Sequence, residues 1–67
     1  MRELKISVAT PKYYGDAEEA ITAAIINSRP GMTCQAVPAI DPEQPGVELY
    51  AIDVRDTQGN WIGFITP

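Results

Sequence analysis

The sequence predicts a two-layer α+β domain of order β-α-β-β-β, in which one helix packs on one face of a mostly antiparallel four-stranded sheet. Residues 47–66 contain two alternating apolar runs around a turn, a pattern typical of a β-hairpin. Residues 16–28 place apolar side chains at three- and four-residue spacing, as an amphipathic helix does. Residues 4–10 alternate apolar and polar side chains, which indicates a strand. A chain of 67 residues has room for a single domain, residues 1–67.

The first strand is predicted over residues 4–10 and ends before Pro11. Its alternation predicts that Leu4, Ile6 and Val8 are buried on one face of the sheet. Its position within the sheet is left open by the sequence, whereas the last three strands are expected to form a meander.

The helix is predicted from Asp16 to about Ser28. Asp16 is a favourable N-cap, and Glu19 three residues later completes a capping-box pattern. Pro30 and Gly31 stop the helix. Ile26 lies off the centre of the apolar stripe, where it would reach a neighbouring strand or a second subunit. The stripe predicted to face the sheet comprises Ala17, Ala20, Ile21, Ala24, Ile25 and Ser28.

A second strand is predicted from Met32 to Val37. Pro38 lacks an amide hydrogen, so this strand is expected to be short or to lie at an edge of the sheet. An acidic loop with two prolines follows, and Pro45-Gly46 fits the centre of a type II turn that leads into the third strand.

The hairpin sequence also predicts which residues of its two strands face each other. If Asp56 faces Asn60 across a three-residue loop, with Gly59 in the left-handed conformation, every pair behind the turn is determined. The predicted pairs are Arg55 with Trp61, Val54 with Ile62, Asp53 with Gly63, Ile52 with Phe64 and Ala51 with Ile65. One face then collects Tyr50, Ile52, Val54, Ile62 and Phe64, and the other collects Ala51, Asp53, Arg55, Trp61 and Ile65.

Charge and composition exclude several functional classes. The net charge is −4 and the basic residues are concentrated near the N-terminus, which disfavours direct nucleic-acid binding because that depends on phosphate neutralisation. A single cysteine excludes an intrachain disulfide, and the lack of histidine excludes a Cys/His zinc site. No apolar run approaches the roughly 18 residues of a membrane span. We therefore expect a cytoplasmic protein.

The sequence offers little for catalysis, and the chain is expected not to be an enzyme. Without histidine there is no ordinary Ser-His or Cys-His nucleophile pair. Cys34 is interpreted as a small core residue, and Asp53 and Asp56 lack the dense acidic pattern of a calcium loop. Neither a metal nor a cofactor is predicted. A reaction at Cys34 or at Tyr13 and Tyr14 remains a third and weaker hypothesis.

Two interaction hypotheses rank above catalysis. In the first, a non-enzymatic inhibitor uses its acidic surface to occupy a basic, nucleic-acid-binding surface of a partner protein. In the second, a small homo-oligomeric or accessory module assembles through the outer face of the 47–66 hairpin, where Arg55 is predicted to stack on Trp61. The candidate partner-binding residues are Asp16, Glu18, Glu19, Asp41, Glu43, Glu48, Asp53, Asp56 and Trp61.

Taken whole, the chain resembles small acidic phage-encoded inhibitors of the anti-CRISPR class, which includes DNA mimics. The resemblance lies in length, acidic charge and the absence of catalytic motifs over the full chain. It implies a subunit of a CRISPR effector complex as the partner, with the acids competing for a surface that reads DNA. It also implies the cytoplasm of a phage-infected host as the location.

Overall fold

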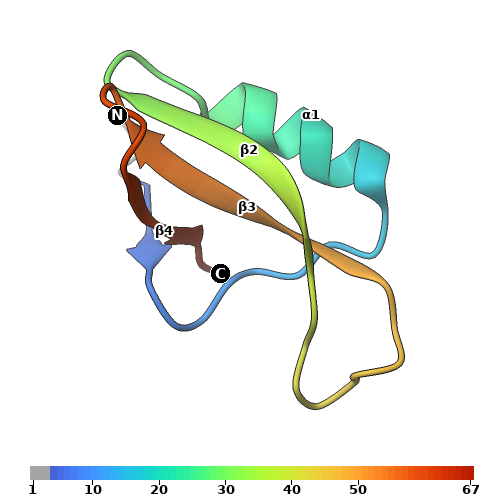
Figure 1. Cartoon of the computed structure of the whole chain (residues 1–67). Coiled ribbons are helices and arrows are strands. Elements are labelled where there is room, and N and C mark those ends of the chain that lie inside the picture. The colour runs from blue at the N-terminus through green and yellow to red at the C-terminus, as the bar shows by residue number, and fades with distance from the viewer. Residues whose placement is uncertain (1–3) are drawn as a thin grey trace.

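Helix α1 (Ala17–Asn27) lies across one face of a four-stranded antiparallel sheet in the computed structural model, which describes residues 4–67 (Figure 1). The sheet order is β1-β4-β3-β2, so the last three strands form the expected meander and the first strand lies at the far edge beside the last. The predicted α+β class is confirmed. The strands are β1 (Ile6–Ser7), β2 (Met32–Ala39), β3 (Leu49–Asp56) and β4 (Trp61–Ile65).

The ends of α1 follow from local chemistry. Asp16 is the N-cap, and its carboxylate accepts a hydrogen bond of 3.0 Å from the amide of Glu18. Ser28 is the C-cap, with its amide bonded to the carbonyl of Ala24 at 3.0 Å. Pro30 and Gly31 then occupy the centre of a tight turn, and the positive φ of Gly31, 89°, is a conformation that glycine adopts without strain. The predicted helix bounds are confirmed.

Only part of the predicted apolar stripe of α1 meets the sheet. Ala20 and Ala24 are buried, whereas Ile21 and Ile25 are 50% and 71% exposed. Side chains as short as alanine allow the helix axis to approach β2 and β3 closely, and branched isoleucines in the same place would hold it away. The helix is therefore rotated toward its alanines. Ile26 is also exposed.

The inner face of the sheet, which is the face covered by α1, carries the core. Ile52 and Val54 of β3 are its largest fully buried side chains. Cys34 of β2 and Ile65 of β4 flank them, and Tyr14 closes the end near the start of α1. The buried core is therefore small and is centred on β3.

The β3–β4 hairpin contains the expected turn but not the expected register. Gly59 has φ of 83°, and Asp56 donates its amide to the carbonyl of Asn60 at 2.9 Å, so the three-residue loop is confirmed. The pair Arg55–Trp61 is also confirmed, but a β-bulge follows, and Val54 pairs with Gly63 instead of Ile62.

Because of the bulge, Phe64 and Ile65 each lie on the face of the sheet opposite to the one predicted for them. Because side chains alternate along a strand, one extra residue sends every later side chain to the opposite face. Phe64, predicted in the core, pairs with Asp53 on the outer face, which is the face opposite α1. Ile65, predicted outside, is buried in the core.

The first strand is shorter than predicted. The hydroxyl oxygen of Ser7 accepts hydrogen bonds from the amides of Ala9 and Thr10, which turns the chain away from the sheet after Ser7. Val8 is consequently 68% exposed rather than buried. A Cβ on Gly63 would lie 2.7 Å from the Ile6 side chain and 2.9 Å from the Ser7 carbonyl oxygen, so glycine is what allows β1 to approach β4 here.

The outer edge of β2 is largely closed to further strand pairing. Met32 exchanges backbone hydrogen bonds with Arg29, and the amide of Cys34 donates to the Ser28 hydroxyl at 3.1 Å. Since backbone groups alternate in direction along a strand, Ala36 and Pro38 also point away from β3, and Pro38 has no amide hydrogen to offer. The edge prediction for β2 is thus confirmed, although the strand continues through Pro38 to Ala39.

The loop between β2 and β3 departs from the predicted type II turn. Val47 donates its amide to the carbonyl of Gln44 at 3.1 Å, so Pro45 and Gly46 do form the centre of a turn. Gly46 is not in the positive-φ conformation that a type II turn requires at its third position.

Replacing Ile52 by alanine should destabilise the domain by about 2–5 kcal/mol, because the substitution opens a cavity at the centre of a small core. Ile25→Ala is the matched control, since the same atoms are removed from an exposed helix position and the cost should stay below about 0.5 kcal/mol. Urea unfolding followed by circular dichroism measures both. Similar losses for the two variants would contradict the assignment of the inner face.

Candidate functional site

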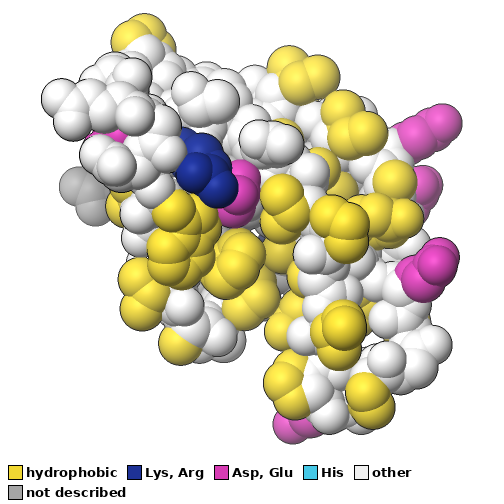
Figure 2. Space-filling model, in the orientation of Figure 1, with side chains coloured by type: hydrophobic (Ala, Val, Ile, Leu, Met, Phe, Trp, Pro, Cys, Tyr) yellow, Lys and Arg dark blue, Asp and Glu magenta, His cyan; other side chains and the backbone are white. Residues whose placement is uncertain are grey.

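The structure divides the predicted partner-binding acids between two regions of the molecule. One region, here called the acidic end, joins the start of α1 to the loop between β2 and β3 (Figure 1). Figure 2 shows acidic side chains along one margin and at the foot of the molecule. The acidic end comprises Asp16, Glu18 and Glu19 from the helix start and Asp41, Glu43 and Glu48 from the loop.

Tyrosine contacts hold the two parts of the acidic end together. Tyr14 and Tyr50 exchange backbone hydrogen bonds of 2.7 and 2.8 Å as an isolated antiparallel bridge. Because the bridge is antiparallel, Asp16, two residues after Tyr14, and Glu48, two residues before Tyr50, lie on the same side of it. The Tyr13 hydroxyl also donates to the Ile40 carbonyl at 3.4 Å, which ties the segment before α1 to the loop. The adjacent tyrosines thus have a structural role.

Several of these carboxylates are fixed in place. Asp16 caps α1, and Asp41 accepts a hydrogen bond of 3.0 Å from the amide of Glu43 within the loop. Glu18, Glu19 and Glu48 are exposed. Two prolines restrict the loop backbone further. The acidic end therefore presents charges on a partly rigid support.

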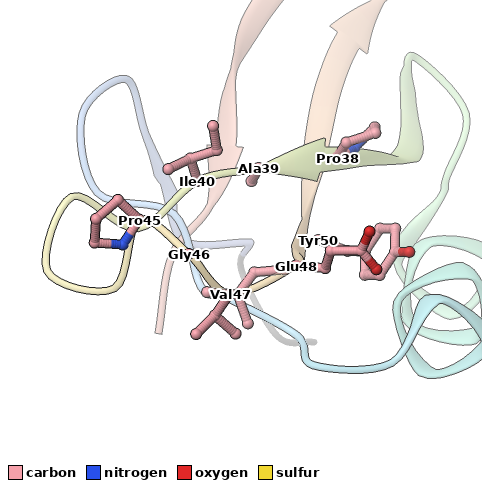
Figure 3. Close-up of a pocket in the computed structure, with 9 residues that line it drawn as sticks. Pro38, Ala39, Ile40, Pro45, Gly46, Val47, Glu48 and Tyr50 are labelled. Carbon is pink, nitrogen blue, oxygen red and sulfur yellow. The ribbon is translucent and has the colours of Figure 1, made fainter.

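A shallow apolar groove of about 630 Å³ adjoins the acidic end (Figure 3). The groove runs between the last residues of β2 and the segment that leads into β3. Ile40 is 68% exposed and Val47 is 45% exposed, so apolar surface lies beside Glu48. The sequence interpretation described this loop as acidic and did not recognise its apolar wall. Its lining includes Pro38, Ile40, Pro45, Val47, Glu48 and Tyr50.

Asp56 lies at the other end of β3, away from the acidic end, and acts as a turn residue. Its carboxylate accepts 2.9 Å hydrogen bonds from the amides of Asn60 and Gln58, and the Asn60 side chain adds a longer one. These bonds, led by that from the Asn60 amide, lower the pKa of Asp56 below its ordinary value.

Asp53, predicted on the outer face, is on that face but buried. It is only 6% exposed, between its cross-strand neighbours Gln35 and Phe64. One carboxylate oxygen, Oδ2, lies 3.7 Å from Nε of Arg55. The other, Oδ1, is buried and accepts no hydrogen bond within the described part of the chain. Such an unsatisfied acceptor is uncommon in a folded protein.

Trp61 is 42% exposed on the outer face, as predicted. Its indole packs edge-to-face on Phe64 with ring centroids 5.3 Å apart. The Arg55 guanidinium donates from Nη1 to the Gly59 carbonyl at 2.9 Å and pairs with Asp53. Among the described residues, the cation–π contact that forms places Lys12 over Tyr14, at 5.1 Å, and not Arg55 over Trp61.

The other features considered for catalysis, metal binding or membrane insertion can be compared with the structure in turn. Cys34 is buried against α1, as interpreted from the sequence, and burial raises the pKa of its thiol despite opposing effects of Ser28 and Arg29. Residues 4–67 contain no cluster of three or more metal-binding side chains. No helix within those residues is long and apolar enough to cross a membrane.

Comparison with protein-family models, with curated proteins and with solved structures gave no match to this chain.

Cys34 should be poorly reactive while the domain is folded, because the thiol is buried and its pKa is raised. Alkylation by iodoacetamide near neutral pH should be on the order of a hundredfold slower than in urea, as reaction requires opening of the core. Mass spectrometry reports on one site, since the chain has one cysteine. Equal rates in folded and unfolded protein would show that Cys34 is accessible.

The stability contributed by Asp56 should depend on pH. Because its pKa is lower in the folded chain, ionised Asp56 stabilises the fold above the ordinary carboxyl pKa of about 3.9, and this contribution is lost as the pH falls through the lowered value. The difference in thermal midpoint between the wild type and Asp56→Asn should therefore be largest near neutrality and should shrink in acid. Glu43→Gln, which removes an exposed carboxylate, controls for net charge. A constant difference across the pH range would contradict the role of the ionised side chain.

Proposed function

We propose that this protein is a non-enzymatic inhibitor whose acidic end occupies a basic, nucleic-acid-binding surface of a partner protein. The anti-CRISPR resemblance of the sequence makes a subunit of a CRISPR effector complex the proposed partner. The observation that carries the proposal is the meeting of the α1 start and the β2–β3 loop at the Tyr14–Tyr50 bridge. That meeting brings Asp16 and Glu48 to the same side of the bridge, from two distant stretches of sequence.

Electrostatics and rigidity support the proposal. Carboxylates can accept charge-assisted hydrogen bonds from arginine and lysine side chains that otherwise bind phosphates. Charges already held by a helix cap and a proline-restricted loop lose little conformational freedom when a partner binds. A net charge of −4 adds long-range attraction to a basic partner.

The apolar groove beside Glu48 supports a protein partner. Ile40 and Val47 offer apolar contact area that a purely phosphate-like surface would lack, and removing apolar area from water favours association. The proposed complex therefore combines salt-sensitive charge pairing with a short-range apolar contact.

The proposal can be tested by charge neutralisation at matched net charge. Glu18→Gln with Glu19→Gln should weaken inhibition of target-DNA binding by a CRISPR effector complex by on the order of tenfold, since exposed pairs contribute ~0.2–1 kcal/mol each and 1.4 kcal/mol is tenfold. Thr57→Lys with Gln58→Lys shifts the net charge equally, at the exposed β3–β4 turn, and should have little effect. Electrophoretic mobility shift of target DNA with a panel of effector complexes provides the measurement.

As salt rises, inhibition of DNA binding by the wild type should weaken and approach that of the Glu18→Gln, Glu19→Gln variant, because dissolved ions screen the same charges. Inhibition that is equally reduced by both double variants would assign the effect to net charge and not to the acidic end. Absence of any effect on every complex in the panel would reject the proposed class of partner.

A further inference from the structure

The apolar groove at the acidic end forms where β2 and β3 separate. Ala39 and Leu49 are the last pair of the two strands, and residues 40–48 between them fold into two consecutive turns. The amides of Gln44 and Val47 each donate to the carbonyl three residues earlier, at 2.9 and 3.1 Å. The loop thereby folds back on itself and leaves a hollow of about 630 Å³ between its two arms (Figure 3).

Both arms of the loop are anchored to the segment before α1. The first arm is held by the hydrogen bond from the Tyr13 hydroxyl to the Ile40 carbonyl, at 3.4 Å. The second arm leads into Tyr50, which exchanges backbone hydrogen bonds with Tyr14. Two prolines in the lining of the groove restrict the backbone further. The groove is therefore formed before any partner binds, and a partner does not have to order it.

The walls of the groove are apolar and lie outside the core. Ile40 is 68% exposed and Val47 is 45% exposed, and neither belongs to the core that α1 covers. Figure 2 shows hydrophobic side chains together with an acidic one over the loop at the foot of the molecule. Apolar surface that is gathered in a hollow and rimmed by polar residues is characteristic of an interaction site.

Charge at the groove has one sign. Glu48 is the only charged side chain among the lining residues, all of which the structure describes, and Asp41 and Glu43 belong to the same loop. The basic residue of the adjoining segment, Lys12, is placed over the Tyr14 ring, with Nζ 5.1 Å from the ring centroid. The complement of this surface is an apolar group with a cation beside it.

We propose that the groove binds a short segment of a partner protein in which an apolar side chain is flanked by lysine or arginine. The apolar side chain lies between Ile40 and Val47, and the flanking cations pair with Glu48 and with the other acids of the loop. This inference rests on the proposed function, because it specifies the part of the partner that the acidic end holds.

The exposure of the walls favours a protein segment over a small molecule. Sites for small molecules enclose roughly 70–90% of the ligand surface. Walls as exposed as Ile40 and Val47 cover a ligand from one side only, whereas a segment that projects from a protein brings further surface to cover them. Charge complementarity selects a basic segment, because a neutral one would leave Glu48 unpaired and an acidic one would be repelled.

Chemical-shift titration of the isotope-labelled full chain tests the proposal. The probe is the peptide Lys-Arg-Leu-Leu-Arg-Lys. The comparison peptides are Lys-Arg-Ser-Ser-Arg-Lys, which keeps only the charge, and Gln-Gln-Leu-Leu-Gln-Gln, which keeps only the apolar part. Each is added to about 1 mM, so that weak binding becomes visible, and the probe should bind on the order of tenfold more tightly than either comparison peptide. The amide signals that shift should be those of Ile40, Val47, Glu48 and Leu49.

Variants of the groove supply matched comparisons. Ile40→Ser with Val47→Ser should weaken binding of the probe by on the order of tenfold, because apolar contact is lost. Ile25→Ser is the control, since it removes the same type of side chain from a helix position that is 71% exposed, and it should leave binding unchanged. Glu48→Gln should weaken binding severalfold and reduce its salt dependence. Gln58→Lys changes the net charge equally at the exposed β3–β4 turn and should have little effect.

Absence of shifts at the groove overturns the proposal, as does equal binding of either comparison peptide or an equal effect of Ile25→Ser. Groove signals that move with the concentration of the protein itself, without peptide, would assign the groove to a second copy and also overturn it. Inhibition of DNA binding by the wild type without peptide binding rejects this inference alone. Peptide binding at the groove without inhibition of any effector complex rejects the proposed function alone. The dispersion of the amide signals verifies that each variant is folded.

Discussion

The β-bulge in β4, where Trp61 and Ile62 together lie opposite Arg55, determines which face of the sheet receives Phe64 and which receives Ile65. Without the extra residue, Phe64 would point toward α1 and Ile65 toward the outside. A phenyl ring on the inner face would compete for the space that Ala20 and Ala24 leave to Ile52 and Val54. The bulge thus permits a close, alanine-lined helix contact on one side and collects aromatic surface on the other.

The sequence alone correctly predicted the features that depend on the conformational preferences of a few neighbouring residues. The Asp16 cap, the Pro30-Gly31 stop and the Asp56–Gly59 turn each depend on one or two residues with strong conformational preferences. The meander of the last three strands and the edge position of β2 were also predicted, whereas the place of the first strand in the sheet was left open.

Features set by tertiary packing could not be read from the pattern. An extra residue in β4 leaves the alternation of Trp61 to Ile65 ambiguous, because both registers give one apolar face. The rotation of α1 depended on how closely the sheet allows a helix to approach, which favours alanine over isoleucine at the contact. At the candidate site, the acids were evident as residue types, but their grouping depends on the Tyr14–Tyr50 bridge between segments far apart in the chain. The burial of Asp53 likewise results from side chains on neighbouring strands.

The closed edge of β2 restricts how copies of this chain can associate. A sheet edge with free amides and carbonyls lets each added chain expose a fresh edge to the next, and growth then has no natural end. Here Ser28 and Arg29 occupy the first part of that edge and Pro38 interrupts the last part, while β1 at the opposite edge spans two residues. Edge-to-edge pairing of copies is thereby hindered at both sides of the sheet, and with it the open-ended growth of a fibre.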